Sequence, residues 1–260
     1  MSDSAHKTRI IAVANQKGGV GKTTTTVNIA ACIAEAGARV LVIDLDPQGN
    51  ASSGLNVRVQ NLESTIYQVV VHEASIDECI EPTEVKNLFI VPSTLDLAGA
   101  EIELVTAIGR ESRLKRALET VIDDYDYVFI DCAPSLGLLT LNALVAAEEV
   151  LMPIQCEYFA LEGVGQLLRS VEMVRKNINP VLEVTTVVCT MFDSRTKLSQ
   201  EVVDNVREYF GDKVCKTIVP RNTKLAEAPS AGKPIITYDS GGKGAKAYRG
   251  VAKEVMAHGK

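Results

Sequence analysis

The sequence predicts an α/β fold, with a doubly wound, mostly parallel sheet and helices on both of its faces. Apolar runs of strand length recur along the 260 residues, and they are rich in β-branched residues and lack polar alternation. Such runs are typical of strands that are covered on both faces. Segments with helical periodicity lie between most of the runs, as crossover connections require. The chain is 46% apolar, enough to bury a full core, and α/β folds of this length are commonly one domain.

The individual elements follow from these patterns and from the residues that end them. Strands are expected at Ile10–Ala14, Val40–Leu45, Leu88–Val91, Tyr127–Ile130, Val150–Ile154, Val184–Thr190 and Val214–Val219. Helices are expected at Thr24–Ala36, Leu114–Asp123, Leu161–Asn177 and Leu198–Phe210. Pro180 stops the third of these helices and Gly211 ends the fourth, because proline cannot continue a helix and glycine readily closes one. We expect a polar tail over residues 1–9 and a single domain over residues 10–260.

A glycine-rich segment, KGGVGKT at residues 17–23, lies between the first expected strand and the first expected helix. A loop in this position directs successive backbone N–H groups into one concavity, where the helix dipole also favours an anion. Its glycines leave room for a triphosphate and permit positive φ angles. Lys22 would reach the β- and γ-phosphates, and the hydroxyl group of Thr23 would hold Mg²⁺. The alternative is a plain glycine-rich turn, which does not account for the order of strand, loop, Lys-Thr and helix.

The nucleotide-binding residues expected from this segment are Lys17, Gly18, Gly19, Val20, Gly21, Lys22, Thr23 and Thr24. The segment departs from the standard P-loop GxxxxGK(S/T), because Gln16 replaces the first glycine and a second lysine, Lys17, follows it. It resembles the KGGxGK(S/T) motif of the ParA/MinD group of ATPases, which also includes the nitrogenase iron protein and the arsenite pump ATPase. The resemblance implies that Lys17 reaches across a dimer interface to the partner's nucleotide, so that ATP binding forms a homodimer. Without that context, Lys17 would be a solvated loop cation.

Two strand ends carry carboxylates that would complete an ATPase site. The second expected strand lies in VLVIDLDPQGNAS, which resembles the switch I segment of the family and implies that Asp44 orients the attacking water and helps to organise the Mg²⁺ shell. The fourth expected strand lies in DYVFIDCAPSLG, where an apolar run precedes Asp131 in the Walker B pattern. Its carboxylate would meet Mg²⁺ through water. The following residues, Cys132 to Gly137, resemble switch II. Carboxylates at strand ends are otherwise common caps and turn formers.

The expected catalytic residues are Lys17, Lys22, Asp44 and Asp131, and the expected metal-site residues are Thr23, Asp44 and Asp131. Together they supply the positioning and charge neutralisation that phosphoryl transfer needs. None of them is a strong general base, and the sequence offers no arginine finger. We therefore expect an ATPase that uses ATP and Mg²⁺, with slow basal hydrolysis that a partner accelerates.

Two later segments indicate which members of this group the chain resembles. TMFDSRT at residues 190–196 and VPRNTKLAEAPSAGKPI at residues 219–235 closely resemble segments of the short, Soj-like ParA proteins that partition chromosomes. In those proteins the second segment borders the adenine, which implies base contacts from Met191, Pro220 and Asn222. A Pro-Arg-Asn turn that serves only as a connector is the alternative. The resemblance covers nearly the whole chain and identifies the expected single domain as a P-loop ATPase domain.

The net charge of −6 alone argues against a polyanionic partner, but the distribution of charge along the chain indicates one. Residues 213–260 hold ten Lys and Arg against three acidic residues, so this segment carries +7 and the rest of the chain −13. A charge run is more often a solvated surface than a binding face. Short Soj-like proteins lack a DNA-binding N-terminal domain, so the resemblance implies that the ATPase fold itself binds non-specific double-stranded DNA by neutralising phosphates. The expected DNA-binding residues are Arg195, Arg221, Lys224, Lys246 and Arg249.

The resemblance also implies a ParB-like centromere-binding partner and a cytoplasmic, nucleoid-associated location. No run approaches the ~18 apolar residues of a membrane span. A MinD-like membrane-positioning ATPase is the main alternative, but Val251, Val255 and Met256 near the C-terminus fit core packing better than bilayer insertion, so we expect no stable membrane association. A metal-cluster carrier is a second alternative, and against it the six cysteines show neither a CxxC pair nor metal-ligand spacing.

Overall fold

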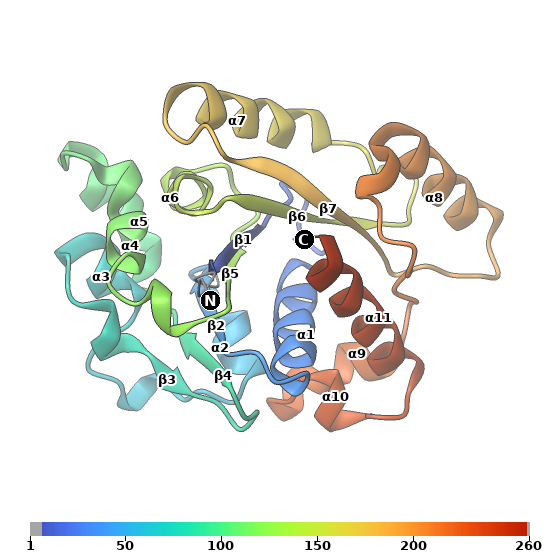
Figure 1. The fold of residues 1–260 in the computed structure, drawn as a ribbon, viewed down its shortest axis with the longest axis horizontal. Coiled ribbons are helices and arrows are strands. Elements are labelled where there is room, and N and C mark those ends of the chain that lie inside the picture. Colours follow the sequence, from blue (N-terminus) through green and yellow to red (C-terminus); the bar gives the residue numbers. More distant parts are fainter. Residues whose placement is uncertain (1–6, 259–260) are drawn as a thin grey trace, which may run out of the picture.

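The computed structural model describes residues 7–258, which contain a sheet of seven strands in the order β3-β4-β2-β5-β1-β6-β7 (Figure 1). The strands are β1 (Arg9–Val13), β2 (Val40–Leu45), β3 (Glu81–Pro82), β4 (Leu88–Val91), β5 (Tyr127–Cys132), β6 (Glu149–Gln155) and β7 (Glu183–Thr190). Every neighbouring pair is parallel except β3 and β4, which run antiparallel at one edge. The predicted α/β class with a mostly parallel sheet is confirmed.

Helices cover both faces of this sheet (Figure 1). Within the described residues they are α1 (Lys22–Glu35), α2 (Asn50–Gly54), α3 (Ile66–His72), α4 (Leu97–Glu103), α5 (Arg113–Leu118), α6 (Leu138–Ala146), α7 (Val164–Asn177), α8 (Lys197–Phe210), α9 (Thr223–Glu227), α10 (Ile235–Tyr238) and α11 (Lys243–His258). Apolar side chains of α3 to α8 fill a first core on one face of the sheet. Those of α1, α2 and α9 to α11 fill a second core on the other face.

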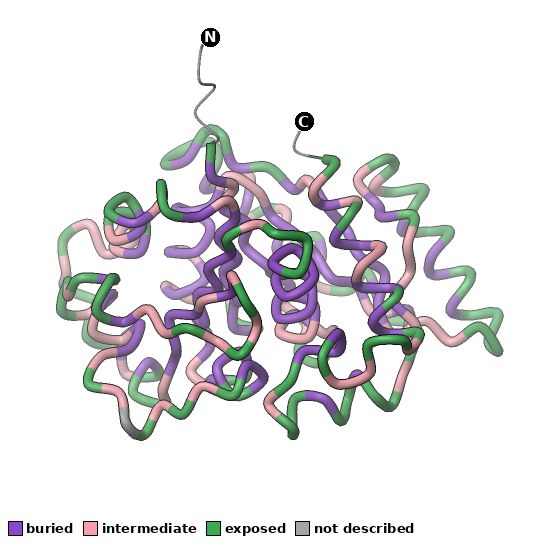
Figure 2. Tube along the Cα trace, turned by 60° about the horizontal axis from the view of Figure 1, so that its bottom comes forward, coloured by how far each residue is buried: buried purple, intermediate pink, exposed green. Residues whose placement is uncertain are grey.

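Each central strand contributes alternate residues to the two cores, as the two-residue period of a strand requires. In β1, Ile10 and Ala12 pack in the first core, whereas Ile11 and Val13 pack in the second. Figure 2 shows the resulting burial, with buried residues concentrated at the centre and exposed residues along the outer helices. The same alternation decides which polar side chains at the strand ends face α1.

Helix α1 is almost entirely buried because the sheet lies on one side and α11 on the other. Gly21 precedes it at φ 89°, a left-handed conformation that glycine adopts without steric cost. The carbonyl oxygen of Gly21 accepts the first bond of the helix from the N–H group of Thr25 at 2.8 Å. The helix therefore begins directly from the glycine-rich loop, and its first N–H groups, which have no partner within the helix, face that loop.

The predicted seventh strand, Val214–Val219, is wrong. Among the described residues, two isolated bridges are all that form here. Val214 pairs with Val187 of β7, and Pro220, directly after the segment, pairs with Phe192 beyond the end of β7. The backbone N–H groups of Lys216 and Thr217 donate instead to the carboxylate of Glu254 on α11, at 2.6 and 2.9 Å. The segment therefore turns toward α11 and does not complete a ladder along β7. The two-residue strand β3 was not predicted.

The predicted helices exist with shifted ends. Helix α7 begins at Val164 because Gly163, at φ 81°, closes the preceding loop. The expected helix over 114–123 divides into α5 and a separate 3₁₀ turn, Ile122–Asp124. Of the predicted N-terminal tail, residues 1–6 lie outside the described part, and β1 already begins at Arg9. Among the described helices, none combines the length and the hydropathy that a membrane crossing requires.

Candidate nucleotide-binding site

The glycine-rich loop between β1 and α1 encloses the side chain of Lys22. Its ammonium nitrogen Nζ donates a hydrogen bond to the carbonyl oxygen of Lys17 at 3.1 Å, and the residue is only 7% exposed. Burial lowers the pKa of Lys22, while the carboxylate of Asp131 acts in the opposite direction. An ammonium group with one carbonyl partner keeps donors for an anion. The loop is therefore arranged to receive phosphate groups at the N-terminus of α1.

Two side chains outside the glycine-rich motif fix this loop. Asn15 accepts a hydrogen bond from the N–H group of Lys17 at 3.0 Å, and its Nδ2 donates to the carbonyl oxygen of Pro153 on β6 at 2.7 Å. Thr190, at the end of β7, donates from its hydroxyl group to the carbonyl oxygen of Val20 at 2.8 Å. The loop is thus bonded to two strands at once. Sequence reasoning missed both residues: Asn15 directly follows the first predicted strand, but nothing in the sequence relates Thr190 to Val20.

Asp44 and Asp131 lie near the carboxyl ends of the adjacent strands β2 and β5, where they are paired in register. Both are fully buried and face α1, because their neighbours along each strand pack in the first core. Asp131 accepts hydrogen bonds from the hydroxyl groups of Thr23 and Thr26 at 2.7 and 2.9 Å. Asp44 accepts from the N–H and hydroxyl groups of Ser52 at 2.8 and 2.7 Å. The structure thus brings the predicted metal-site residues together, and it adds Thr26 and Ser52.

The surroundings of these carboxylates fit a magnesium ion. Burial raises the pKa of Asp131 to about 7, with a further contribution from the charge of Asp44, and burial raises the pKa of Asp44 to about 6. Two buried carboxyl groups with raised pKa values favour a bound cation, because a cation stabilises their charged forms. The hydroxyl and carboxylate oxygens here are the donors that Mg²⁺ prefers. In the part of the chain that the structure describes, no group of three or more His, Cys, Asp or Glu side chains could hold a metal ion by itself. Phosphates and water would therefore supply the remaining ligands.

Two adjoining pockets open from the glycine-rich loop. The larger, about 650 Å³, lies between the loop, α2 and the segment after α9. The smaller, about 390 Å³, is lined by Met191, Pro220 and Asn222, the three residues predicted to contact the base. Gly21 and Met191 line both pockets, so one nucleotide could extend from one into the other. Tyr248 of α11 also lines the smaller pocket and was missed, since no local motif marks it.

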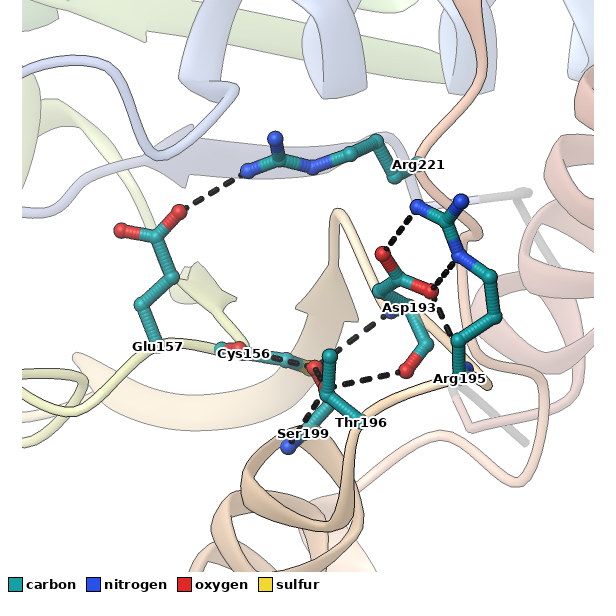
Figure 3. A network of polar contacts seen from close by, with 7 residues as sticks. All are labelled: Cys156, Glu157, Asp193, Arg195, Thr196, Ser199 and Arg221. Carbon is teal, nitrogen blue, oxygen red and sulfur yellow. Dashed lines mark hydrogen bonds and ion pairs between the residues drawn. The ribbon is translucent and has the colours of Figure 1, made fainter.

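The predicted DNA-binding residues Arg195 and Arg221 lie near one another beyond the carboxyl ends of β6 and β7 (Figure 3). Each pairs with an acidic side chain: Arg195 with Asp193 at 2.7 Å, and Arg221 with Glu157 at 2.9 Å. Hydrogen bonds from the guanidinium group and the backbone of Arg195 hold the pKa of Asp193 well below its usual range. The structure therefore gathers two of the predicted cations into one cluster.

The other predicted DNA-binding residues lie around α9 and α11. Lys224 pairs with Glu227 at 2.9 Å. Arg249 donates two hydrogen bonds to the carboxylate of Glu35 at the end of α1, at 2.6 and 2.8 Å. Lys246 is exposed and makes no ion pair with another described residue. Arg249 therefore joins α11 to α1, which gives one of the five residues a role in helix packing.

This arrangement of loop, lysine and strand-end carboxylates defines the class of P-loop nucleotide-binding proteins. A family profile described as an AAA domain matches residues 8–184. The sporulation initiation inhibitor protein Soj of Bacillus subtilis (strain 168) is 55% identical over 96% of this chain and 99% of its own length. The chromosome partitioning protein ParA of Caulobacter vibrioides (strain NA1000 / CB15N) is 48% identical over 98% of this chain and 96% of its own length. The chain belongs to the ParA/Soj family of chromosome-partitioning ATPases, as predicted.

Solved structures agree with this assignment. A protein named as cobyrinic acid a,c-diamide synthase from Mycobacterium smegmatis, with bound ADP and magnesium, has a TM-score of 0.85 at 40% identity over 96% of this chain and 95% of that chain. It is also known with an ATP analog and magnesium. The cell division ATPase MinD of Pyrococcus furiosus has a TM-score of 0.78 at 25% identity over 96% of this chain and 98% of that chain. The predicted cofactors, ATP and Mg²⁺, agree with the ligands of the first protein.

Without nucleotide and metal, the burial of Asp131 should make stability depend on pH. The pKa of this carboxyl group is about 7 in the folded protein, against about 3.9 in an unfolded chain. Between these values the unfolded chain binds fewer protons, so the free energy of unfolding falls as the pH rises, by up to about 1.4 kcal/mol per pH unit. In D131N this contribution is absent, and we expect a shallower fall than in the wild type.

Urea unfolding at a series of pH values, in the presence of a chelator, measures this slope. D123N changes an exposed carboxylate and is the matched control. Equal slopes for D131N and the wild type, with D123N also unchanged, would contradict the argument.

Proposed function

We propose that this partitioning ATPase forms a dimer when it binds ATP, that the dimer binds DNA without sequence preference, and that a ParB-like partner stimulates hydrolysis. One observation carries the proposal. Lys22 occupies the inside of the phosphate-binding loop, whereas Lys17, whose carbonyl group it contacts, is only partly buried. A second lysine at the mouth of the loop is suited to neutralise a triphosphate that another subunit holds. Association with the nucleoid would follow from DNA binding by the dimer.

Each residue of the site would have a distinct part in ATP hydrolysis. Lys22 would neutralise the β- and γ-phosphates, and Thr23 with Asp131 would hold Mg²⁺, which shields the phosphate charge. Ser52 donates two hydrogen bonds to one oxygen of Asp44, and these fix the carboxylate that would orient the attacking water. No arginine is among the described residues that line the larger pocket. These features support a slow basal rate that rises when a partner acts on the site.

An exposed aromatic pair supports the dimer, and it lies on a loop that approaches Gln16, the residue before Lys17. Tyr158 and Phe159 are 76% and 58% exposed and pack edge to face, with ring centroids 5.0 Å apart. They belong to the loop between β6 and α7, in which Gly163 lies so near Gln16 that a Cβ atom on Gly163 would be 3.3 Å from its Oε1 atom. Exposed aromatic side chains that pack together are typical of a protein interface.

Arg195 and Arg221 form a cluster of cations that is suited to DNA. Their side chains are 84% and 59% exposed. Exposed ion pairs contribute at most about 1 kcal/mol, so DNA phosphates can compete with Asp193 and Glu157 for the two guanidinium groups. Contacts to phosphates carry no sequence information, and a dimer would present the cluster twice, which raises the affinity through effective concentration.

Helix α11 argues against the MinD-like membrane alternative. Val251 and Val255 are buried in the second core, and Met256 packs against it. These apolar side chains are therefore already covered by protein. We take the reaction from the partitioning relatives and not from the synthase, because the relatives are 48–55% identical against 40% for the synthase, over similar shares of the chain.

Replacing both exposed aromatic residues should prevent dimerisation. We expect the Y158S/F159S variant to bind ATP in its own loop but to remain monomeric with a non-hydrolysable ATP analogue and Mg²⁺, because the apolar contact is lost while the loop is intact. Analytical ultracentrifugation measures the oligomeric state. Y209S, which removes a tyrosine that is 62% exposed on α8, is the matched control. A double variant that dimerises as readily as the wild type would exclude this surface.

Neutralising the arginine cluster should weaken DNA binding, and ATP turnover without DNA is measured in parallel because Arg221 also lines the smaller pocket. For R195Q/R221Q we expect at least a tenfold loss of affinity (about 1.4 kcal/mol) and a smaller slope of log Kobs against log salt, because phosphate contacts are lost. A gel shift at several salt concentrations, with ATP, measures both. R175Q/K176Q, which removes two exposed cations of α7, is the control. Unchanged affinity and salt slope in R195Q/R221Q would refute the assignment.

A further inference from the structure

A hollow that shares no lining residue with the nucleotide pockets lies between α4, α6 and α7. It has a volume of about 530 Å³, and its mostly apolar walls include Val105, Leu136, Leu141 and Met173. Its rim is open, since Val105 is 59% exposed and Met173 is 64% exposed. Large apolar side chains gathered around one open hollow mark an interaction surface.

One polar group in the wall of this hollow lacks a partner. The Oε1 atom of Glu101, on α4, is buried and makes no hydrogen bond to a described residue. Arg110 also lines the hollow, but its guanidinium group donates to the backbone carbonyl of Val105. A buried acceptor without a donor is costly, and a carboxylate in an apolar wall is best satisfied by a cation. The hollow therefore combines apolar walls with one site for a positive charge.

The same carboxyl group lies against the loop that follows Asp131. A Cβ atom on Gly137 would overlap the carboxyl group of Glu101, so this side chain lies directly against the backbone of Gly137. Gly137 ends the segment 132–137, in which Pro134 lines the larger nucleotide pocket. A displacement of Glu101 would therefore act on a segment that borders both the hollow and the nucleotide site.

We propose that this hollow docks the partner that stimulates hydrolysis, through a segment that presents apolar side chains and one lysine or arginine. The apolar side chains fill the space between the three helices, and the cation pairs with Glu101. An acidic or phosphorylated segment would be repelled by this carboxylate. The inference rests on the proposed function and adds the location and chemistry of docking. Pairing draws Glu101 away from Gly137, which allows the segment 132–137 to move and couples docking to hydrolysis.

The docking site is tested by measuring steady-state ATP turnover in the presence of DNA while the ParB-like protein of the same organism is added in increasing amounts. E101R reverses the unpaired charge, and M173D places a charge on the opposite wall. We expect either change to raise the partner concentration for half-maximal stimulation at least tenfold, with a smaller increase for E101Q. The matched controls should behave as the wild type: E103Q, on the same helix but bonded to the hydroxyl group of Tyr67, and V181D, at an apolar residue that is 61% exposed elsewhere.

A photo-crosslinking amino acid at position 105 locates the partner directly. We expect a crosslink to the ParB-like protein that E101R abolishes. The docking site would be overturned if the partner stimulates the wild type, E101R and M173D equally and no crosslink forms. That result would leave the proposed function intact. A crosslink between two copies of this chain would overturn it as well, in favour of self-association. A wild type that neither binds nor responds to the partner would overturn both proposals.

Discussion

The nucleotide site is arranged around the buried ammonium group of Lys22. Burying a cation costs free energy unless negative charge lies close to it. Here the carboxylate of Asp131 and a backbone carbonyl oxygen supply part of that compensation. The loop is shaped around this requirement: Gly21 provides a left-handed turn, and Asn15 and Thr190 tie the loop to neighbouring strands. The remaining donors of the ammonium group are left for an anion. Because a second buried cation would add to this cost, Lys17 remains at the rim of the loop.

The fold supplies the other half of the site through the geometry of a parallel sheet. Parallel strands end at the same edge, and β2 and β5 are neighbours, so Asp44 and Asp131 meet although the chain separates them widely. Strand alternation turns both carboxylates toward α1, whose first two turns offer Thr23 and Thr26. Burial then raises the pKa of both carboxyl groups, so the protein bears a cost in stability that a bound cation would remove.

The sequence predicted most of the sheet and the local parts of the site, because both depend on short patterns. The glycine-rich loop and the strand-end carboxylates are such patterns, and resemblance to a family located the residues around the smaller pocket. What could not be predicted depends on contacts between distant segments. The bond from Thr190 to Val20 and the pairing of Arg249 with Glu35 exist only once the chain is folded. The wrong strand at Val214–Val219 has the same cause, since Glu254 of α11 takes its backbone donors.

In the proposed dimer, lysines from two subunits act on one triphosphate. Mixing K17A and K22A subunits separates the two lysines, because in a mixed dimer the K17A subunit keeps an intact loop and receives Lys17 from its partner. ATP turnover should be nearly absent for each variant alone and should appear when the two are mixed. Full turnover by K17A alone, or no gain on mixing although mixed dimers form, would contradict the claim.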